Sequence, residues 1–154
     1  MKSQIGVEFF LVLSVVVAFS VILYATAYSE VGKTRALNDA VLSKSAIDSM
    51  AQAVDFAFLS GNATLLRREL FVSPNSNCFY NTTSGVLKLY CTVSSEYLKE
   101  LTAGKEQVFS RELLVPRGKL VLSDCAPFTG GWVNVTIRNE MASSGFVNVS
   151  CKNA

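Results

Sequence analysis

The chain has 154 residues, of which 50% are apolar and 17% are charged. Soluble domains carry about 25% charged residues, so the chain is too apolar for a disordered protein and too short for much more than one domain with an appendage. The net charge is +2 and no dense basic stripe occurs, which argues against nucleic-acid binding. The sequence has no histidine, which removes the His-dependent nucleophile systems and the commonest zinc ligand. We therefore expect no enzyme activity, no metal site and no cofactor.

The longest apolar segment runs from Phe9 to Tyr28 without a charged residue. At about 1.5 Å per residue it would form about 30 Å of helix, which matches the hydrocarbon thickness of a bilayer. A buried helix of a soluble domain would show a polar face, whereas here only Ser14, Ser20 and Thr26 interrupt the apolar run. The segment is therefore predicted to span a membrane.

This segment is expected to be the first part of one long helix, because no proline occurs before Pro74. Residues 29–60 continue it as an amphipathic helix whose apolar positions follow heptad spacing, at Leu37, Ala40, Ile47, Ala51, Val54 and Phe58. Gly61 is a suitable helix stop. The sequence thus predicts a helix over residues 4–60, followed by a short helical turn over Thr64–Leu70.

After Pro74 the pattern changes to the two-residue alternation of half-buried strands. It predicts six strands, at Cys78–Asn81, Leu87–Val93, Gln107–Val115, Lys119–Leu122, Val133–Arg138 and Val147–Cys151. Residues 95–103 are predicted to form a short helix. The expected fold class is α+β, with a long N-terminal helix followed by a small antiparallel β-sandwich or sheet as a head domain over residues 61–154.

Four cysteines lie beyond the apolar segment, and none belongs to a Cys-x-x-Cys pair. An even number of cysteines in a small domain favours two disulfides that form outside the reducing cytosol. Four cysteines allow three pairings. Of these we expect Cys78 with Cys91 across a hairpin, and Cys125 with Cys151 across neighbouring strands.

Four Asn-x-Ser/Thr sequons are present, at Asn62, Asn81, Asn134 and Asn148. The content of asparagine, serine and threonine would give about 1.6 sequons by chance, so the excess favours a glycosylated surface. Together with the cysteines, the sequons predict the orientation in the membrane. The N-terminus is expected inside the cell and the C-terminal head outside.

The N-terminus carries the most informative pattern. Met-Lys-Ser precedes Gln4-Ile-Gly6-Val-Glu8-Phe9, and the apolar segment follows directly. This arrangement resembles the class III signal peptide of archaeal type IV pilins, whose pattern is Gln-x-Ser/Gly-x-Glu-Phe/Tyr before a long hydrophobic helix. The resemblance covers residues 1–30, and Gly6 stands where serine is commoner.

The resemblance implies that a prepilin peptidase cuts between Ser3 and Gln4, so that residues 1–3 are a leader peptide and the apolar segment 9–28 stays in the mature chain. Glu8 would then pair with the new amino terminus of an adjacent subunit. By the same resemblance, the residues expected to act in recognition by the peptidase and in assembly are Gln4, Gly6, Glu8 and Phe9.

The function implied by this resemblance is structural. Identical or related subunits would leave the lipid bilayer and form a helical, pilus-like filament on the cell surface, for adhesion. An assembly ATPase and a membrane platform protein would drive polymerisation. The precursor would reside in the cell membrane and the assembled filament outside the cell.

Two alternatives share most of these features. Ala25-Thr-Ala27 is a fair site for ordinary signal peptidase, which would give a secreted glycoprotein cleaved after Ala27. A single-pass membrane anchor that carries an extracellular binding domain fits as well.

Candidate sites in the head are weaker: Trp132, Phe128 and Tyr80 could form an aromatic patch. Scattered carboxylates are expected to be solvated surface, at Glu96, Glu100, Glu106, Glu112, Asp124 and Glu140.

Overall fold

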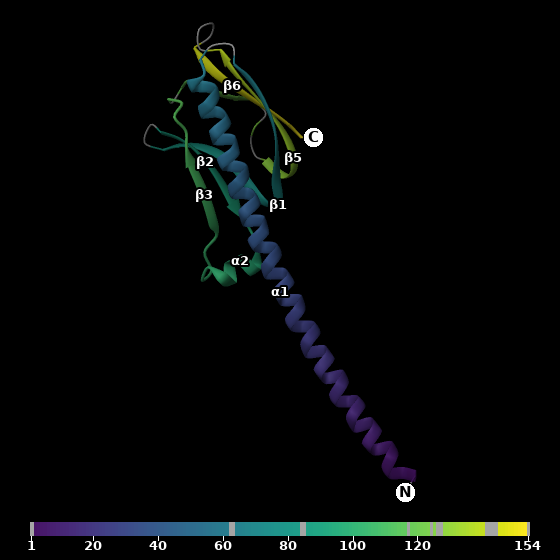
Figure 1. Ribbon diagram of the computed structural model, residues 1–154. Coiled ribbons are helices and arrows are strands. Elements are labelled where there is room, and N and C mark those ends of the chain that lie inside the picture. The colour runs from purple at the N-terminus through teal and green to yellow at the C-terminus, as the bar shows by residue number, and fades with distance from the viewer. Residues whose placement is uncertain are drawn as a thin grey trace. The chain divides into compact units, whose positions relative to one another are not determined.

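The computed structural model in Figure 1 describes residues 2–61, 64–83, 86–116, 118–123, 125, 128–140 and 145–153. The chain divides into two compact units, Met1–Arg35 and Ala36–Ala154. Their boundary falls inside the long helix and not between the helix and the strands. The reason is that helical residues from Ala36 onward share two apolar clusters with residues of the sheet.

The N-terminal helix α1 spans Lys2–Leu59, close to the predicted range of 4–60. It ends where the Ser60 amide donates to the Phe56 carbonyl at 2.8 Å and Gly61 adopts a φ of 83°. That left-handed conformation is open to glycine at little steric cost, so Gly61 ends the helix as the sequence predicts. By length and composition, α1 contains a stretch that could cross a membrane.

The β part is one six-stranded sheet with the strand order β3-β2-β1-β5-β6-β4. A short helix, α2, connects β2 to β3 over Glu96–Leu101. The strands are β1 (Leu65–Thr83), β2 (Val86–Val93), β3 (Gln107–Glu112), β4 (Leu120–Ser123), β5 (Phe128–Glu140) and β6 (Phe146–Asn153). The α+β fold class is confirmed, and the head contains a single sheet.

Two predictions about the strands are wrong. The sheet is mixed and not antiparallel throughout, because β4 pairs with β6 in parallel. The helical turn predicted over Thr64–Leu70 is instead the start of β1, which pairs antiparallel with β5 from Leu65 to Val72. Leucine, arginine and glutamate favour helices locally, but pairing with a distant strand and burial of Leu70 and Val72 override this weak preference.

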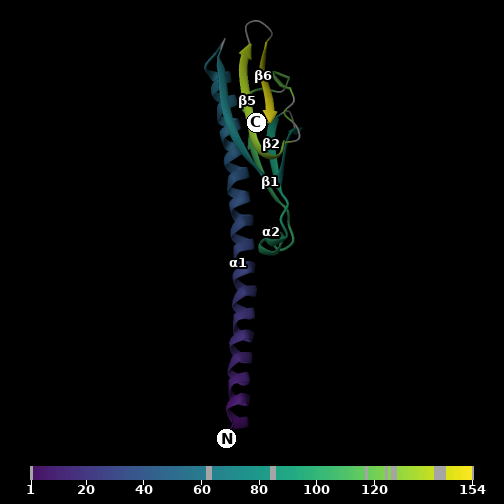
Figure 2. The same cartoon turned by 90° about the vertical axis from the view of Figure 1, so that its right-hand side faces the viewer.

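Within the second unit, the C-terminal part of α1 lies against one face of the sheet (Figure 2). Small side chains on this side of the helix allow close approach: Ala51 and Ala57 have no exposed surface. The sheet contributes the alternate, inward-facing residues of each strand, and the most buried are Cys91, Val93, Val135, Ile137, Val147 and Val149. The opposite residues of these strands form the outer face of the sheet.

Candidate functional site

The apolar residues of the first unit are exposed all around α1. From Val7 to Val31 every large apolar side chain keeps at least 44% of its surface accessible. Soluble monomers rarely leave so much contiguous apolar surface uncovered, because its hydration is unfavourable. By its length and apolar surface, this part of the helix could cross a membrane.

The serine and threonine hydroxyls between Phe9 and Tyr28 are satisfied by the helix itself. Ser14 and Ser20 donate to the carbonyls of Leu11 and Val16, each at 2.8 Å, and Thr26 donates in the same way to carbonyls one turn earlier. Such back-bonding leaves none of these three hydroxyls in need of a partner outside the helix. These three side chains can therefore enter a hydrocarbon environment without losing hydrogen bonds.

Glu8 is the one charged residue between Lys2 and Glu30. It lies on α1 beside Gly6 and Phe9, and all three residues are exposed. Within the described part of the chain, no basic side chain forms a salt bridge with Glu8. Ser3 and Gln4 belong to the same helix, but their side chains lie outside the described ones. A carboxylate next to an apolar segment is unfavourable where that segment lies in a membrane.

The two disulfides join the predicted cysteines, so the pairing is confirmed. Cys78 and Cys91 bond directly opposite each other on β1 and β2. Cys125 follows β4 and bonds to Cys151 on the neighbouring strand β6. All four side chains are buried in the core between helix and sheet.

Three of the four predicted glycosylation sites lie on strands, and Asn62 is outside the described residues. Asn81 is exposed near the end of β1, whereas Asn134 and Asn148 are half-buried on β5 and β6. On β5 and β6 each asparagine alternates with buried valines, which places its side chain on the outer face of the sheet.

The aromatic residues singled out in the sequence do not form one patch. Trp132 is 57% exposed and packs edge-on against Phe71, with 5.3 Å between the ring centroids. Among the described residues no ring contact joins Tyr80 to Trp132, and the side chain of Phe128 lies outside the described ones. Phe71 was missed because only the β1–β5 register brings it opposite Trp132.

The head carboxylates are dispersed along the chain. Glu112 bonds to Lys88 across β2 and β3, and this hydrogen bond together with the negative charge raises the pKa of Lys88. Glu106 lies 3.8 Å from Lys99, and Asp124 is outside the described residues. Within the described ranges no group of three potential metal ligands occurs.

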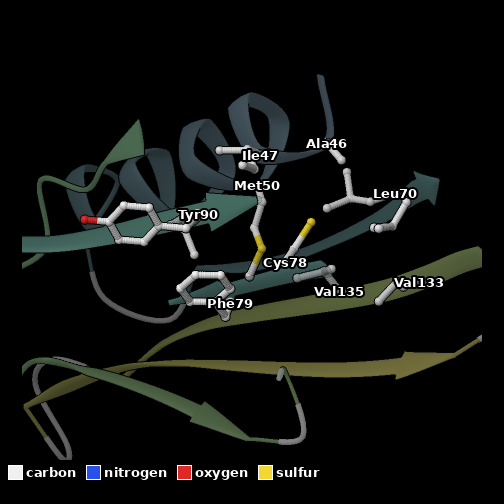
Figure 3. Close-up of a pocket in the computed structure, with 11 residues that line it drawn as sticks. Ala46, Ile47, Met50, Leu70, Cys78, Phe79, Tyr90, Val133 and Val135 are labelled. Carbon is white, nitrogen blue, oxygen red and sulfur yellow. The ribbon is translucent and has the colours of Figure 1, made fainter. Parts of the chain in front are cut away.

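A small cavity between α1 and the sheet has a volume of about 20 Å³ (Figure 3). It is lined mainly by apolar side chains, among them Met50 from α1, Phe79 from β1 and Val135 from β5. The hydroxyl of Tyr90 points away from the other labelled side chains. The pocket is partly open, since Phe79 in its lining is exposed and Tyr90 is half-buried. It has room for about one water molecule, and its apolar lining offers little to bind one.

No protein-family model matches the sequence, and neither a curated protein nor a solved structure matches the chain. The described residues offer an exposed apolar helix with one carboxylate, a disulfide-bonded sheet and three sequons on strands.

Proposed function

We propose that this chain is the structural subunit of an extracellular type IV pilus-like filament, made from a membrane-anchored precursor. The observation that carries the proposal is the apolar surface of α1 from Val7 to Val31, which is exposed on every side of the helix. Lipid covers such a surface in the precursor. In the filament, the same residues of other copies replace the lipid.

Glu8 favours assembly over a simple anchor. An anchor requires only the apolar segment from Phe9 to Tyr28, and a carboxylate at its edge weakens insertion. A filament gives this group a use, because cleavage between Ser3 and Gln4 creates a positively charged amino terminus. Glu8 pairs with that terminus on an adjacent copy and thereby sets the spacing between subunits. This pairing rests on the resemblance of the N-terminal pattern to class III signal peptides.

The amphipathic half of α1 distinguishes a filament subunit from an anchored monomer less clearly than its sequence suggests. Ile47 and Val54 are buried against the chain's own sheet, so an anchored monomer also covers most of this stripe. Leu37, at the start of the predicted stripe, stays exposed, as do Val41, Phe56 and Leu59 elsewhere on this half. These residues support contacts with neighbouring copies in a filament.

The proposed partners follow from this route. A prepilin peptidase removes the leader, an assembly ATPase and a platform protein extract subunits from the bilayer, and the filament serves in adhesion. The head needs no catalytic group for this role, since the filament works through its surface and its mechanical continuity.

The intact mass of the mature protein from membranes and sheared cell surfaces tests the proposal. Loss of residues 1–3, with the chain present in filaments seen by electron microscopy, is the expected result. Loss of residues 1–27 in a soluble product would support the secreted glycoprotein. An uncleaved chain confined to membranes would support an anchored binding domain, and either of these results would overturn the filament.

A further inference from the structure

Three of the four sequons are preceded by an aromatic residue, which the Asn-x-Ser/Thr pattern itself does not require. An aromatic residue stands two positions before the asparagine in Phe79-Tyr-Asn81, Trp132-Val-Asn134 and Phe146-Val-Asn148. Only Asn62 lacks it, with Ser60 at that position. Aromatic residues make up 10% of the chain, so three such cases among four sequons would arise by chance in fewer than about one arrangement in a hundred.

The strands place each aromatic residue beside its asparagine. Residues two apart on a strand project from the same face, about 6.6 Å from each other along the strand. Trp132 and Asn134 follow this rule on β5, where the intervening Val133 is buried. Phe146 and Asn148 do so on β6. Both pairs therefore lie on the outer face of the sheet, opposite the face that packs on α1.

The aromatic rings are accessible but held in place. Phe79 is 37% exposed and Phe146 is 38% exposed, against 57% for Trp132. Each ring has a neighbour: Phe79 stacks on Tyr90 at 5.5 Å between centroids, and the ammonium of Lys119 lies 5.8 Å from the Phe146 ring. Trp132 rests edge-on against Phe71, as described above. Preorganised, exposed rings at three sites indicate surfaces that receive a ligand.

We propose that Asn81, Asn134 and Asn148 carry N-linked glycans whose first sugar packs against the preceding aromatic ring. The sugar donor is a lipid-phosphate-linked saccharide. The side-chain nitrogen of asparagine bonds to the anomeric carbon of the sugar, and the bond from that carbon to the phosphate oxygen breaks. The lipid phosphate leaves with the bonding electrons, and the amide gives up one proton.

Both the sugar and the aromatic ring have surfaces that favour this packing. One face of a pyranose presents mainly C–H groups, which carry a slight positive charge and are weakly hydrated. An aromatic face is apolar and carries a negative quadrupole, so the two surfaces attract each other and exclude water. A sugar joined to an asparagine about 6.6 Å from the ring can reach back to it without ordering a loop. The glycan then covers apolar surface that the fold leaves exposed.

This inference rests on the proposed location of the head outside the membrane, but not on filament assembly. Trp132 is the single tryptophan of the chain, so its fluorescence reports directly on the site at Asn134. The protein purified from its native cells is analysed by glycopeptide mass spectrometry and by acrylamide quenching of this fluorescence. We expect a glycan on Asn134 and a tryptophan shielded from acrylamide.

Two matched variants separate the effect of the glycan on the quenching of Trp132 from the effect of changing the side chain at position 136. Thr136→Val destroys the sequon and leaves Asn134 in place, whereas Thr136→Ser preserves the sequon. Thr136→Val should lose the glycan and the shielding together, and Thr136→Ser should keep both. Asn62→Gln, at the sequon without an aromatic residue, should leave the quenching of Trp132 unchanged. Asn134→Gln repeats the loss of the glycan, so that a folding defect caused by one substitution is recognised.

Two results would overturn the inference. If Asn134 carries a glycan but the two Thr136 variants are quenched equally, the sugar does not pack on Trp132. If an exported head carries no glycan at any of the three strand sequons, the sites are wrong even where filaments form. Filaments are scored separately by electron microscopy, so a glycosylated head without filaments would overturn the proposed function and leave the glycan sites standing.

Discussion

Asn139 near the end of β5 donates its side-chain amide to the carbonyl oxygen of Ala57 in the last turn of α1, over 2.6 Å. The Asn139 side chain is 1% exposed, and its amide also lies 3.4 Å from the Phe58 carbonyl. The last carbonyls of a helix lack partners within the helix. A buried asparagine on the sheet thus satisfies the end of α1 and fixes where the helix stops against the head.

Asn139→Leu should lower the free energy of unfolding of the head by about 1–3 kcal/mol, because the buried Ala57 carbonyl loses its donor. Denaturant unfolding of the full chain in detergent, followed by the fluorescence of Trp132, measures the change. The neighbouring Arg138→Ala is the control, since its exposed ion pair with Glu140 at 3.7 Å contributes at most about 1 kcal/mol. Equal stability of Asn139→Leu and the parent chain would contradict the capping role.

The elements that could be predicted are those with a local signal. The absence of proline and the stop at Gly61 define α1, and strict alternation identifies β5 and β6. Cys78 and Cys91 lie on the two strands of a hairpin. Of the three ways to pair four cysteines, the one that joins these two could therefore be predicted from the sequence.

The remaining features depend on contacts between distant residues. Leu65 begins a strand only because Arg138 lies opposite it, 73 positions along the chain. The parallel pairing of β4 with β6 follows from the path of the chain and leaves no pattern in either strand. Asn139 occupies an inward position of β5, where the alternation predicts an apolar residue. In the candidate sites, the ring neighbours of Trp132 and Phe146 likewise follow from register and loop geometry.

Gly130→Ala should destabilise the head more than Gly131→Ala. Both glycines have positive φ, of 34° and 130°, so both substitutions strain the backbone. At Gly130 a Cβ would also lie 2.5 Å from the Cα of Pro74, a backbone atom in the irregular middle of β1. At Gly131 no described atom beyond the two chain neighbours lies within 4 Å of the added Cβ. We expect the additional overlap to cost about 1–3 kcal/mol in denaturant unfolding. A larger effect at Gly131 would show that the close contact with Pro74 does not limit this position.

Removal of either disulfide should destabilise the head by about 3 kcal/mol, because each bridge restricts the unfolded chain. The bonds enclose sequence separations of 13 and 26 residues, so the pair Cys125→Ala and Cys151→Ala should have a slightly larger effect than Cys78→Ala with Cys91→Ala. Melting curves with and without reductant provide the measurement. In the untreated native protein, a thiol reagent should label no cysteine, and labelling of all four would refute both bridges.

The leader should fail to be removed in Gln4→Lys and Gly6→Arg, because the peptidase must accept these positions at the membrane surface. Misfolding does not explain such a defect at Gly6, since no described atom beyond the neighbouring residues and backbone of its own helix lies within 4 Å of an added Cβ there. Gly6→Ser is the matched control and should be processed. Intact mass of the membrane-bound chain distinguishes precursor from product. Normal removal of residues 1–3 from the two charged variants would argue against a class III signal peptide.

Glu8→Ala should be cleaved and inserted normally but should not enter filaments, because the contact it loses lies between subunits. Removing the carboxylate makes insertion easier, so a membrane-fraction blot should show undiminished protein. Glu8→Gln retains hydrogen-bonding groups without the charge and should assemble in part, which separates the role of charge from that of shape. Electron microscopy of sheared cell surfaces counts the filaments for each variant. If Glu8→Ala assembles as well as the parent chain, pairing with the neighbouring amino terminus is not the contact that sets subunit spacing. If instead no filament contains the parent chain, the exposed apolar surface of α1 is covered by lipid alone, as in an anchored protein.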